Sequence, residues 1–429
     1  MKINTKLIPS QTKNLLDIAF DIGKDRLYYY GEVPIESNAV DCFEGDFQNR
    51  NQTVEEELRK LNSFANTKGY SGLRIICEPT GGFERRLLQY ARKGKHSSAY
   101  VNPEAVHKMQ VVQSNDYNKT DKKDPKTIYL LAKLNKVLHQ RNLQGPWLVL
   151  RECNVRYERL EKRMVELKNR IYRVLRQLFC ELSFSKDWIF EGKAAESVVD
   201  AYGLNPYRIL ASGKTRVRKK LLKLEVKENT IRRLLEDATV SVLQELDGAF
   251  IEFLEEDLRM EFDQLKYTQR MMLETREKMI SLLDGLSEKR EVRIEPKKDL
   301  ISPFMLSRII AETGPLDDFV NIQQLYRYGG LNIRQKESGK FKGQNKLSKK
   351  GRPLLRKVLN QAILARVTKN GLYGEYYHGK KETGMMGPKA MVSVSRKMLK
   401  MLFGIHRSKE EYDASRVFIS QSEYLKKAA

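Results

Sequence analysis

Two aspartates stand three residues apart in the stretch NKTDKKDPKTIYLLAKL, which covers residues 118–134. Residues at this spacing share one face of a helix, so the carboxylates of Asp121 and Asp124 can both reach one ion. Aspartate is also favoured at the N-cap and first turn of a helix, and Pro125 suits a first turn because its missing N–H is not needed there. The residues alone leave open whether the pair begins a helix or binds a metal ion.

Two more acids end predicted strands, namely Asp21 in DIAFDIGKDRL and Glu78 in CEPTGGF. Taken singly, each is a common turn residue. Together with the aspartate pair they form the kind of set that metal-assisted phosphoryl chemistry needs, in which several carboxylates converge on a hard cation such as magnesium or manganese. Asp17 is the alternative to Asp21, because the two-residue alternation of a strand puts both on one face.

A strongly basic stretch near the C-terminal side contains two serines. Between residues 334 and 357 there are ten Lys or Arg and one Glu. Such a stretch can wrap phosphates with its side chains and backbone N–H groups. A serine oxygen that attacks phosphorus also gains from nearby cations, because they stabilise the charge that develops. By residue type alone, Ser338 and Ser348 are equally suitable, and each is also typical of an ordinary loop hydrogen-bonding residue.

The composition points to a polyanionic partner. The formal net charge is +24 over 429 residues, and a chain this basic attracts nucleic acid through its long-range field and through counterion release. We find no apolar run near the roughly 18 to 20 residues that span a bilayer, no secretory signal, and no CxxC pair that would bind zinc. We therefore expect a cytoplasmic nucleic-acid-binding protein with reduced cysteines and no membrane contact.

Periodicity divides the chain into three regions. Residues 15–33 predict a β-hairpin, and strand and helix candidates then alternate to about residue 134, so residues 1–145 predict an α/β domain. Residues 146–299 contain two segments with heptad spacing, which predict an antiparallel coiled-coil pair, and a basic helical insert at 183–248. Residues 300–429 predict a third, mainly α-helical domain.

Several motifs resemble a known family. DIAFDIGKDRL, CEPTGGF and NPEAVHKMQ followed by KTDKKDPKTIYLLAK are similar to the motifs of insertion-sequence transposases with an N-terminal RuvC-like (RNase H-like) four-acid domain and a C-terminal serine domain. These are understood as bridge-RNA-guided DNA recombinases, and pilin-gene invertases are relatives. Matched by motif, the DEDD acids are Asp21, Glu78, Asp121 and Asp124. The resemblance covers residues 15 to about 135 and 300 to about 365.

The same resemblance favours one of the two serines as the nucleophile. ESGK followed by LSKKGRPLLRKVL is similar to the family's C-terminal motif, in which the serine of the SG pair attacks DNA. The resemblance therefore implies that Ser338 is the nucleophile. The cations that we expect to contact nucleic acid are Lys119, Lys122, Lys123, Arg334, Lys336, Lys340, Lys342, Lys346, Lys349, Lys350 and Arg352. One departure is that the family's P-G-I-G hairpin is missing from KKDLISPFMLSRIIAETGPLDDF, so the helix-hairpin-helix element that grips DNA is in doubt.

The resemblance implies an RNA-guided, site-specific DNA recombinase of an insertion sequence. It would cut and rejoin target and donor DNA through a phosphoserine intermediate, with Mg²⁺ or Mn²⁺ held by the four acids. A structured bridge RNA and a homo-oligomer, a dimer or a tetramer in the synaptic complex, are the implied partners. One alternative is a metal-dependent RuvC-like nuclease or junction resolvase without a serine nucleophile. Another is a non-catalytic protein that binds nucleic acid through its charge alone.

Overall fold

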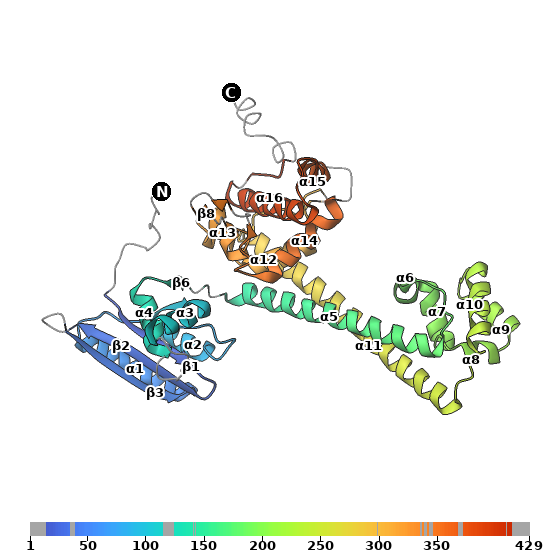
Figure 1. Cartoon of the computed structure of the whole chain (residues 1–429), viewed down its shortest axis with the longest axis horizontal. Coiled ribbons are helices and arrows are strands. Elements are labelled where there is room, and N and C mark those ends of the chain that lie inside the picture. The colour runs from blue at the N-terminus through green and yellow to red at the C-terminus, as the bar shows by residue number, and fades with distance from the viewer. Residues whose placement is uncertain are drawn as a thin grey trace, which may run out of the picture. The chain divides into compact units, whose positions relative to one another are not determined.

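The computed structural model of the chain consists of two compact units, 1–142 and 143–429 (Figure 1). It describes residues 14–34, 39–114, 124–139, 141, 143–297, 299–334, 337–338, 341–342, 346–367, 372–408 and 410–413.

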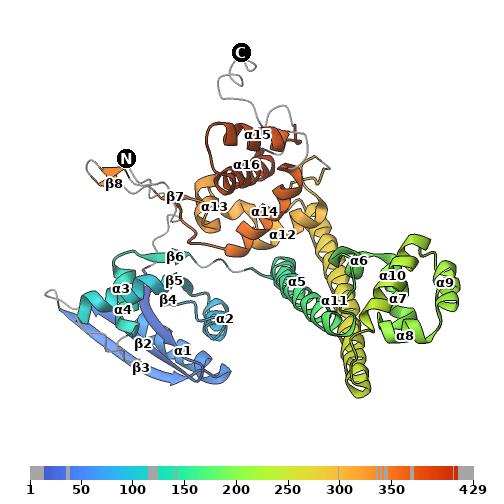
Figure 2. The same ribbon diagram turned by 45° about the vertical axis from the view of Figure 1, so that its right-hand side comes forward.

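The first unit contains a mixed six-stranded sheet in the order β3-β2-β1-β4-β5-β6. The strands are β1 (Leu16–Ile22), β2 (Arg26–Pro34), β3 (Val40–Gln48), β4 (Leu73–Cys77), β5 (Ser97–Val101) and β6 (Val137–His139). The first three form an antiparallel meander, and Figure 2 shows β2 and β3 side by side. β4 lies parallel to β1, β5 lies parallel to β4, and β6 closes the other edge antiparallel to β5.

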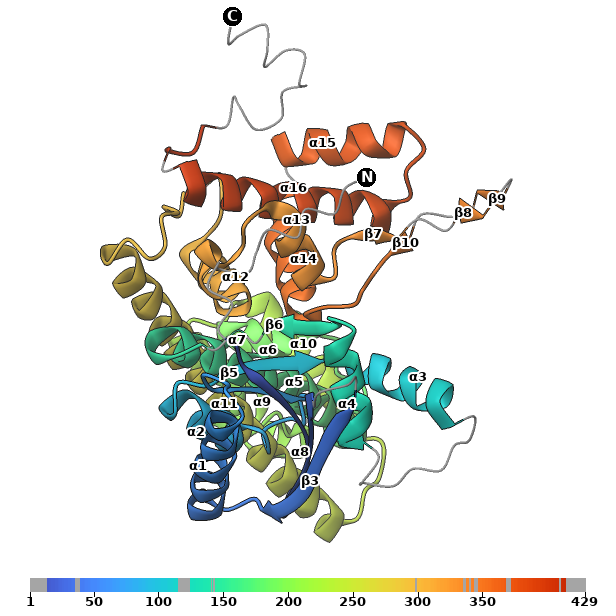
Figure 3. The ribbon, with the colours of Figure 1, turned by 90° about the vertical axis from the view of Figure 1, so that its left-hand side faces the viewer.

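Helices cover both faces of this sheet. They are α1 (Asn51–Thr67), α2 (Arg85–Lys93), α3 (Pro103–Ser114) and α4 (Asp124–Lys133). One core contains Ile18, Phe20 and Ile75 with residues of α1 and α2, and a second core contains Ala19 and Ile76 with residues of α3 and α4. Figure 3 accordingly shows α1 and α2 on one side of the sheet and α3 and α4 on the other. The central strands are buried on both faces, which explains their nearly continuous apolar sequences.

The second unit is built on two long helices, α5 (Gly145–Leu178) and α11 (Gly248–Glu288). The start of α5 shares a core with the end of α11, and the end of α5 shares another with the start of α11, so the pair is antiparallel. Five helices connect them: α6 (Lys186–Glu191), α7 (Lys193–Tyr202), α8 (Pro206–Ala211), α9 (Lys214–Lys223) and α10 (Glu228–Ser241). We call the connecting residues 183–247 the helical insert.

The C-terminal part packs on the start of α5 and the end of α11 in one shared core. Its helices are α12 (Pro303–Thr313), the 3₁₀ turn η1 (Leu316–Asp318), α13 (Ile322–Gly329), α14 (Pro353–Val367), α15 (Leu372–Glu382) and α16 (Gly387–Ser408). Four two-residue strands lie between α13 and α14: β7 (Ile333–Arg334), β8 (Glu337–Ser338), β9 (Phe341–Lys342) and β10 (Lys346–Leu347).

The structure confirms a mixed α/β region followed by a mainly helical remainder, including the hairpin at residues 15–33, the antiparallel helical pair and the helical insert. Regular coiled-coil packing along the pair stays a prediction. Sequence reasoning missed β3 and β6. No helix within the described ranges is both long enough and apolar enough to cross a membrane.

Candidate functional site

The register of β1 and β4 places the two strand-end acids at neighbouring positions. β1 and β4 are adjacent parallel strands, and Phe20 is paired with Cys77 at the end of their ladder. Asp21 and Glu78 are the next residues of the two chains. Because adjacent strands lie about 4.8 Å apart, this register brings the two carboxylate-bearing residues to neighbouring positions at one edge of the sheet.

Helix α4 runs antiparallel to β1 and places its first residue at the same edge. The Nζ of Lys133, at the end of α4, lies 2.7 Å from Oε2 of Glu32. Glu32 follows Gly31, which pairs with Ile18 near the start of β1. The helix rises about 13 Å from Lys133 back to Asp124. Near the other end of α4, the Nζ of Lys126 lies 5.2 Å from the centre of the Tyr30 ring, and Tyr30 pairs with Ala19, farther along β1. Asp124 therefore lies toward the end of β1 that carries Asp21.

Asp124 is largely buried, with 9% of its surface exposed, and the amide Nε2 of Gln110 on α3 donates to its Oδ1. This contact orients the carboxylate of Asp124 from the side of α3. The fourth predicted acid, Asp121, lies outside the described residues, as do Lys119, Lys122 and Lys123. Among the residues that the structure describes, no three His, Cys, Asp or Glu side chains come close enough to hold a metal ion.

Asp17 has a structural partner. The guanidinium of Arg74 on β4 binds its carboxylate through two nitrogens, with Nε 2.6 Å from Oδ1. This fork-to-fork contact raises the pKa of Arg74, although partial burial acts against it. Because Arg74 neutralises its carboxylate within the sheet, Asp17 is poorly suited to bind a cation.

A buried asparagine ties together the two turns that carry Asp21 and Glu78. The Nδ2 of Asn49 donates to the carbonyl oxygen of Gly23 at 3.1 Å and to that of Phe83 at 3.3 Å. Its Oδ1 accepts a bond from Nη1 of Arg86 at 3.1 Å. Gly23 follows Asp21 by two residues, and Phe83 ends the turn that begins at Glu78. Asn49 therefore sets the spacing of these turns.

Glu84 orders the second turn from within. Its Oε2 accepts bonds from the hydroxyl of Thr80 at 2.7 Å and from the backbone N–H of Gly82 at 2.8 Å. Burial acts to raise the pKa of Glu84, but these hydrogen bonds outweigh it, and the pKa lies below its ordinary value. The sequence signalled Glu84 only as an acid at a helix start, and it gave no signal for the contacts of Asn49.

The basic segment of the second unit has a rigid root. β7 and β10 pair through Arg334 and Lys346. Below them, the backbone N–H of Arg352 donates to the carbonyl of Tyr328 at 3.0 Å, and a Cβ at Gly351 would lie 2.4 Å from the nitrogen of Gly330. The two chain segments therefore touch backbone to backbone, and only glycine fits at Gly351. We call residues 328–334 and 346–352 the hairpin root.

The two candidate serines have different positions. Ser348 is 6% exposed, and its Oγ accepts a bond from the N–H of Lys350 at 3.3 Å. This is the short local contact of a turn-forming serine. Ser338 belongs to β8 and pairs with Phe341 through the backbone, while its side chain lies outside the described set. The burial of Ser348 makes its hydroxyl poorly suited to attack DNA.

Most of the described cations around the root are exposed: Arg334, Lys346, Lys349 and Lys350. Arg334 also donates to the carbonyl of Ser348 at 2.8 Å. Arg352 differs, because its Nε lies 2.8 Å from Oε2 of Glu312, a side chain with no exposed surface. Arg352 therefore has a structural contact in addition to any contact with phosphate. The side chains of Lys336, Lys340 and Lys342 lie outside the described set.

A buried polar network supports this region from below. Asn154 of α5 donates to Oε1 of Glu312 at 3.0 Å, and Nε of Arg308 donates to Oδ1 of Asn154 at 2.9 Å. A second nitrogen of Arg308 reaches Gln361 of α14 at 2.9 Å. The network joins α5, α12 and α14, so it fixes the helix that follows the hairpin root.

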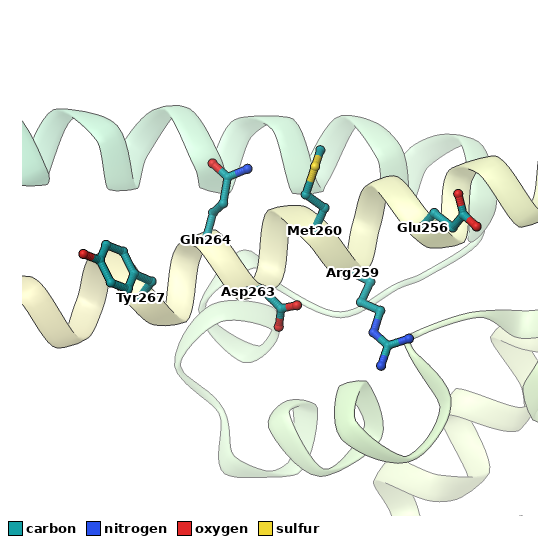
Figure 4. Close-up of a pocket in the computed structure, with 6 residues that line it drawn as sticks. All are labelled: Glu256, Arg259, Met260, Asp263, Gln264 and Tyr267. Atoms are coloured by element: carbon teal, nitrogen blue, oxygen red, sulfur yellow. The ribbon is translucent and has the colours of Figure 1, made fainter.

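A hollow on α11 is lined by other residues. Figure 4 shows its lining side chains along a single helix, including Arg259, Met260 and Tyr267. None of its lining residues belongs to the predicted acid set or to the basic segment. It is therefore not part of the candidate site.

Two family models match the chain. A model of the DEDD transposase domain of the IS110 type, described as "Transposase", matches residues 35–180. A model described as "Transposase IS116/IS110/IS902 family" matches residues 300–378. The matched segments contain 146 and 79 residues, which together are just over half of the chain. No curated protein matches it.

Proposed function

Because this chain is an IS110-family transposase with a DEDD domain, we propose that it cuts and transfers DNA strands with a divalent metal ion held by Asp21, Glu78, Asp121 and Asp124. The observation that carries the proposal is the register of β1 and β4, which sets Asp21 beside Glu78, together with the direction of α4, which brings Asp124 to the same edge. Carboxylate oxygens are the ligands that magnesium and manganese prefer, so the donor set fits such an ion.

When bound, such an ion would polarise the scissile phosphate and lower the pKa of water beside it. Other residues of the chain hold the candidate metal ligands in position. Gln110 orients the carboxylate of Asp124, and Asn49 holds the turns after Asp21 and Glu78 at a fixed spacing. Since one misplaced ligand weakens a metal site, these contacts matter nearly as much as the acids.

The test uses the full chain, a DNA duplex that bears the ends of its own insertion sequence, and magnesium. Asp21→Asn, Glu78→Gln and Asp124→Asn should each lower strand cleavage by about two orders of magnitude or more. Asp17→Asn is the matched control on the same strand and should keep most of the activity. Cleavage that persists in all three variants, or in excess chelator, would refute the proposal.

A nucleophilic role for Ser338 is the second candidate. Two observations favour it: the C-terminal family match includes this residue, and the competing Ser348 is buried with its hydroxyl engaged. In this mechanism the Ser338 oxygen displaces the 3′ or 5′ oxygen of the DNA strand from phosphorus, and the departing oxygen takes up a proton. A phosphodiester bond to serine replaces the broken DNA bond.

A covalent protein–DNA adduct separates the two candidates. If Ser338 is the nucleophile, labelled DNA stays attached to the denatured protein in the wild type and in Ser348→Ala, and is lost in Ser338→Ala. If the acids act alone on water, no adduct forms in any variant, and Ser338→Ala still cleaves.

We also propose that a structured RNA and a homo-oligomer take part, as the resemblance implies. The net charge of +24 supports a second polyanion besides DNA. Sequencing of RNA that co-purifies with the full chain should return one structured species from the flanks of its own gene. A random mixture of cellular RNA would contradict this part of the proposal.

A further inference from the structure

The helical insert separates its charges along the sequence. From residue 208 to residue 233 there are ten Lys or Arg and two Glu, whereas the rest of the insert has two Lys and eight acids. Helix α9, in the middle of the basic part, has no acid at all and six cations: Lys214, Arg216, Arg218, Lys219, Lys220 and Lys223. A solvated helix that serves only to fold would mix the two signs, because alternating charges stabilise a helix.

The cations of α9 are directed away from the body of the insert. Val217 and Leu221 are its buried residues, and they anchor it in the core that the insert shares with α5 and α11. All six cations are exposed. Figures 1 and 2 both place α9 on the side of the insert that faces away from the α5–α11 pair.

Few of these charges are neutralised. The Nε of Arg218 lies 2.8 Å from Oε1 of Glu228, and the Nζ of Lys220 lies 4.9 Å from the centre of the Tyr202 ring. Lys214, Arg216, Lys219 and Lys223 have no ion pair with any residue in the described part of the chain. Four unpaired cations thus lie within one helix about 15 Å long.

The positions of these cations destabilise helix α9. Lys214 and Arg216 lie in the first turn, where the positive end of the helix dipole disfavours cations. Arg216 with Lys220, and Lys219 with Lys223, are like charges four residues apart, which also repel. The backbone before them is open, since a Cβ at Gly213 would meet no atom within 4 Å. A polyanion on this face would turn each unfavourable charge into a favourable one.

We propose that α9 binds the phosphate backbone of duplex DNA. The proposal rests on the proposed function for its choice of DNA as the partner. Duplex DNA carries one charge for about every 1.7 Å of its axis, which is dense enough to meet all four unpaired cations of α9. Because contacts to phosphate fix position and not sequence, α9 holds the DNA and does not select it.

The test measures binding of the full chain to a duplex of about 40 base pairs, in chelator so that no cleavage occurs. One variant combines Lys214→Gln, Arg216→Gln, Lys219→Gln and Lys223→Gln. Its matched control removes three Lys and one Arg that are also exposed and have no ion pair within the described part of the chain. They lie on α5, on α11 and just beyond α11: Lys162→Gln, Arg173→Gln, Lys278→Gln and Lys289→Gln. Both variants lose four charges, so they differ only in where the charge is lost.

In the α9 variant, the slope of log Kd against log salt concentration should fall by about 3 to 4, since each phosphate contact contributes about 0.9. In the control it should change by less than about 1. Equal changes in the two variants would overturn the proposal, because they would reflect net charge alone. Loss of affinity for a structured RNA with unchanged affinity for the duplex would overturn it as well. Circular dichroism of both variants checks that the helices remain.

A photo-crosslinking residue provides a second measurement that does not depend on affinity. Placed at the exposed Thr215, it should crosslink to the duplex, and at Lys278 it should not. No crosslink at residue 215 under saturating DNA would refute the contact. If the chain binds DNA through α9 but fails to cleave with magnesium, the proposed function fails while this inference stands. If the chain cleaves DNA and the salt slope of the α9 variant is unchanged, this inference fails while the proposed function stands.

Discussion

The Nδ2 of Asn49 donates to the carbonyl oxygen of Gly23 at 3.1 Å, two residues beyond Asp21. The same amide reaches Phe83 at the end of the turn that begins with Glu78. One buried side chain thus controls the spacing of two turns that carry predicted metal ligands.

Asn49→Ala should weaken metal binding more than it weakens the fold. It leaves two backbone carbonyls without a donor, a loss of about 1 to 3 kcal/mol in the free energy of unfolding. Looser turns should raise the magnesium concentration at half-maximal cleavage by about 10- to 100-fold. A magnesium titration of cleavage measures this shift. Asn229→Ala, at an exposed position on α10, should leave the titration unchanged. A purely structural role for Asn49 would lower stability with no shift in the titration.

Glu312→Ala should be among the most destabilising single changes in the second unit. The buried carboxylate pairs with Arg352 and accepts from Asn154, so its removal leaves Nε of Arg352 and Nδ2 of Asn154 without these acceptors. Breaking a buried pair in this way costs about 3 to 5 kcal/mol. Urea unfolding should show it as a lower midpoint. The control Glu277→Ala, at an exposed position on α11, should change the free energy of unfolding by less than about 0.5 kcal/mol.

Gly351→Ala and Gly285→Ala should act in opposite directions. A Cβ at Gly351 would lie 2.4 Å from two backbone atoms, and its φ of 149° is unfavourable for any other residue. A Cβ at Gly285 would meet nothing within 4 Å, and this glycine lies within α11. We therefore expect Gly351→Ala to lower the unfolding temperature and Gly285→Ala to raise it. For Gly285→Ala, the gain in the free energy of unfolding should be up to about 1 kcal/mol. A tolerated Gly351→Ala would show that the root is not rigid.

The contribution of Glu84 to stability should disappear in acid. Its hydrogen bonds with Thr80 and Gly82 lower its folded-state pKa below the ordinary value for glutamate, so the ionised form stabilises the fold. This stability is fully present above the unfolded-state pKa and is lost as the pH falls through the lower folded-state pKa. The difference in unfolding free energy between the wild type and Glu84→Gln should therefore be constant from pH 7 to about pH 5 and shrink below it. A difference that does not change with pH would contradict this assignment.

Local patterns in the sequence predicted elements better than they predicted contacts. The β1–β2 hairpin follows from two apolar runs around one turn, and α4 from its start signal and apolar body. β3 was missed because it is an edge strand in which only Phe47 is buried, so it has little apolar alternation. The pairing of Phe20 with Cys77 and the reach of Asn49 to Phe83 join residues far apart in the chain. Only the folded sheet brings such residues together. The sequence could therefore suggest candidate acids, but it could not predict the side chains that hold them in place.

The hairpin root limits where related chains can gain or lose residues. The close contact of Gly330 and Gly351 is made entirely below the paired residues Arg334 and Lys346. Extra residues inserted above that pair would leave the contact untouched, and lengthening such a loop is inexpensive in entropy. Insertions or deletions within the root would instead separate the two glycines. Related chains should therefore differ in size above the pair and keep a constant residue count below it.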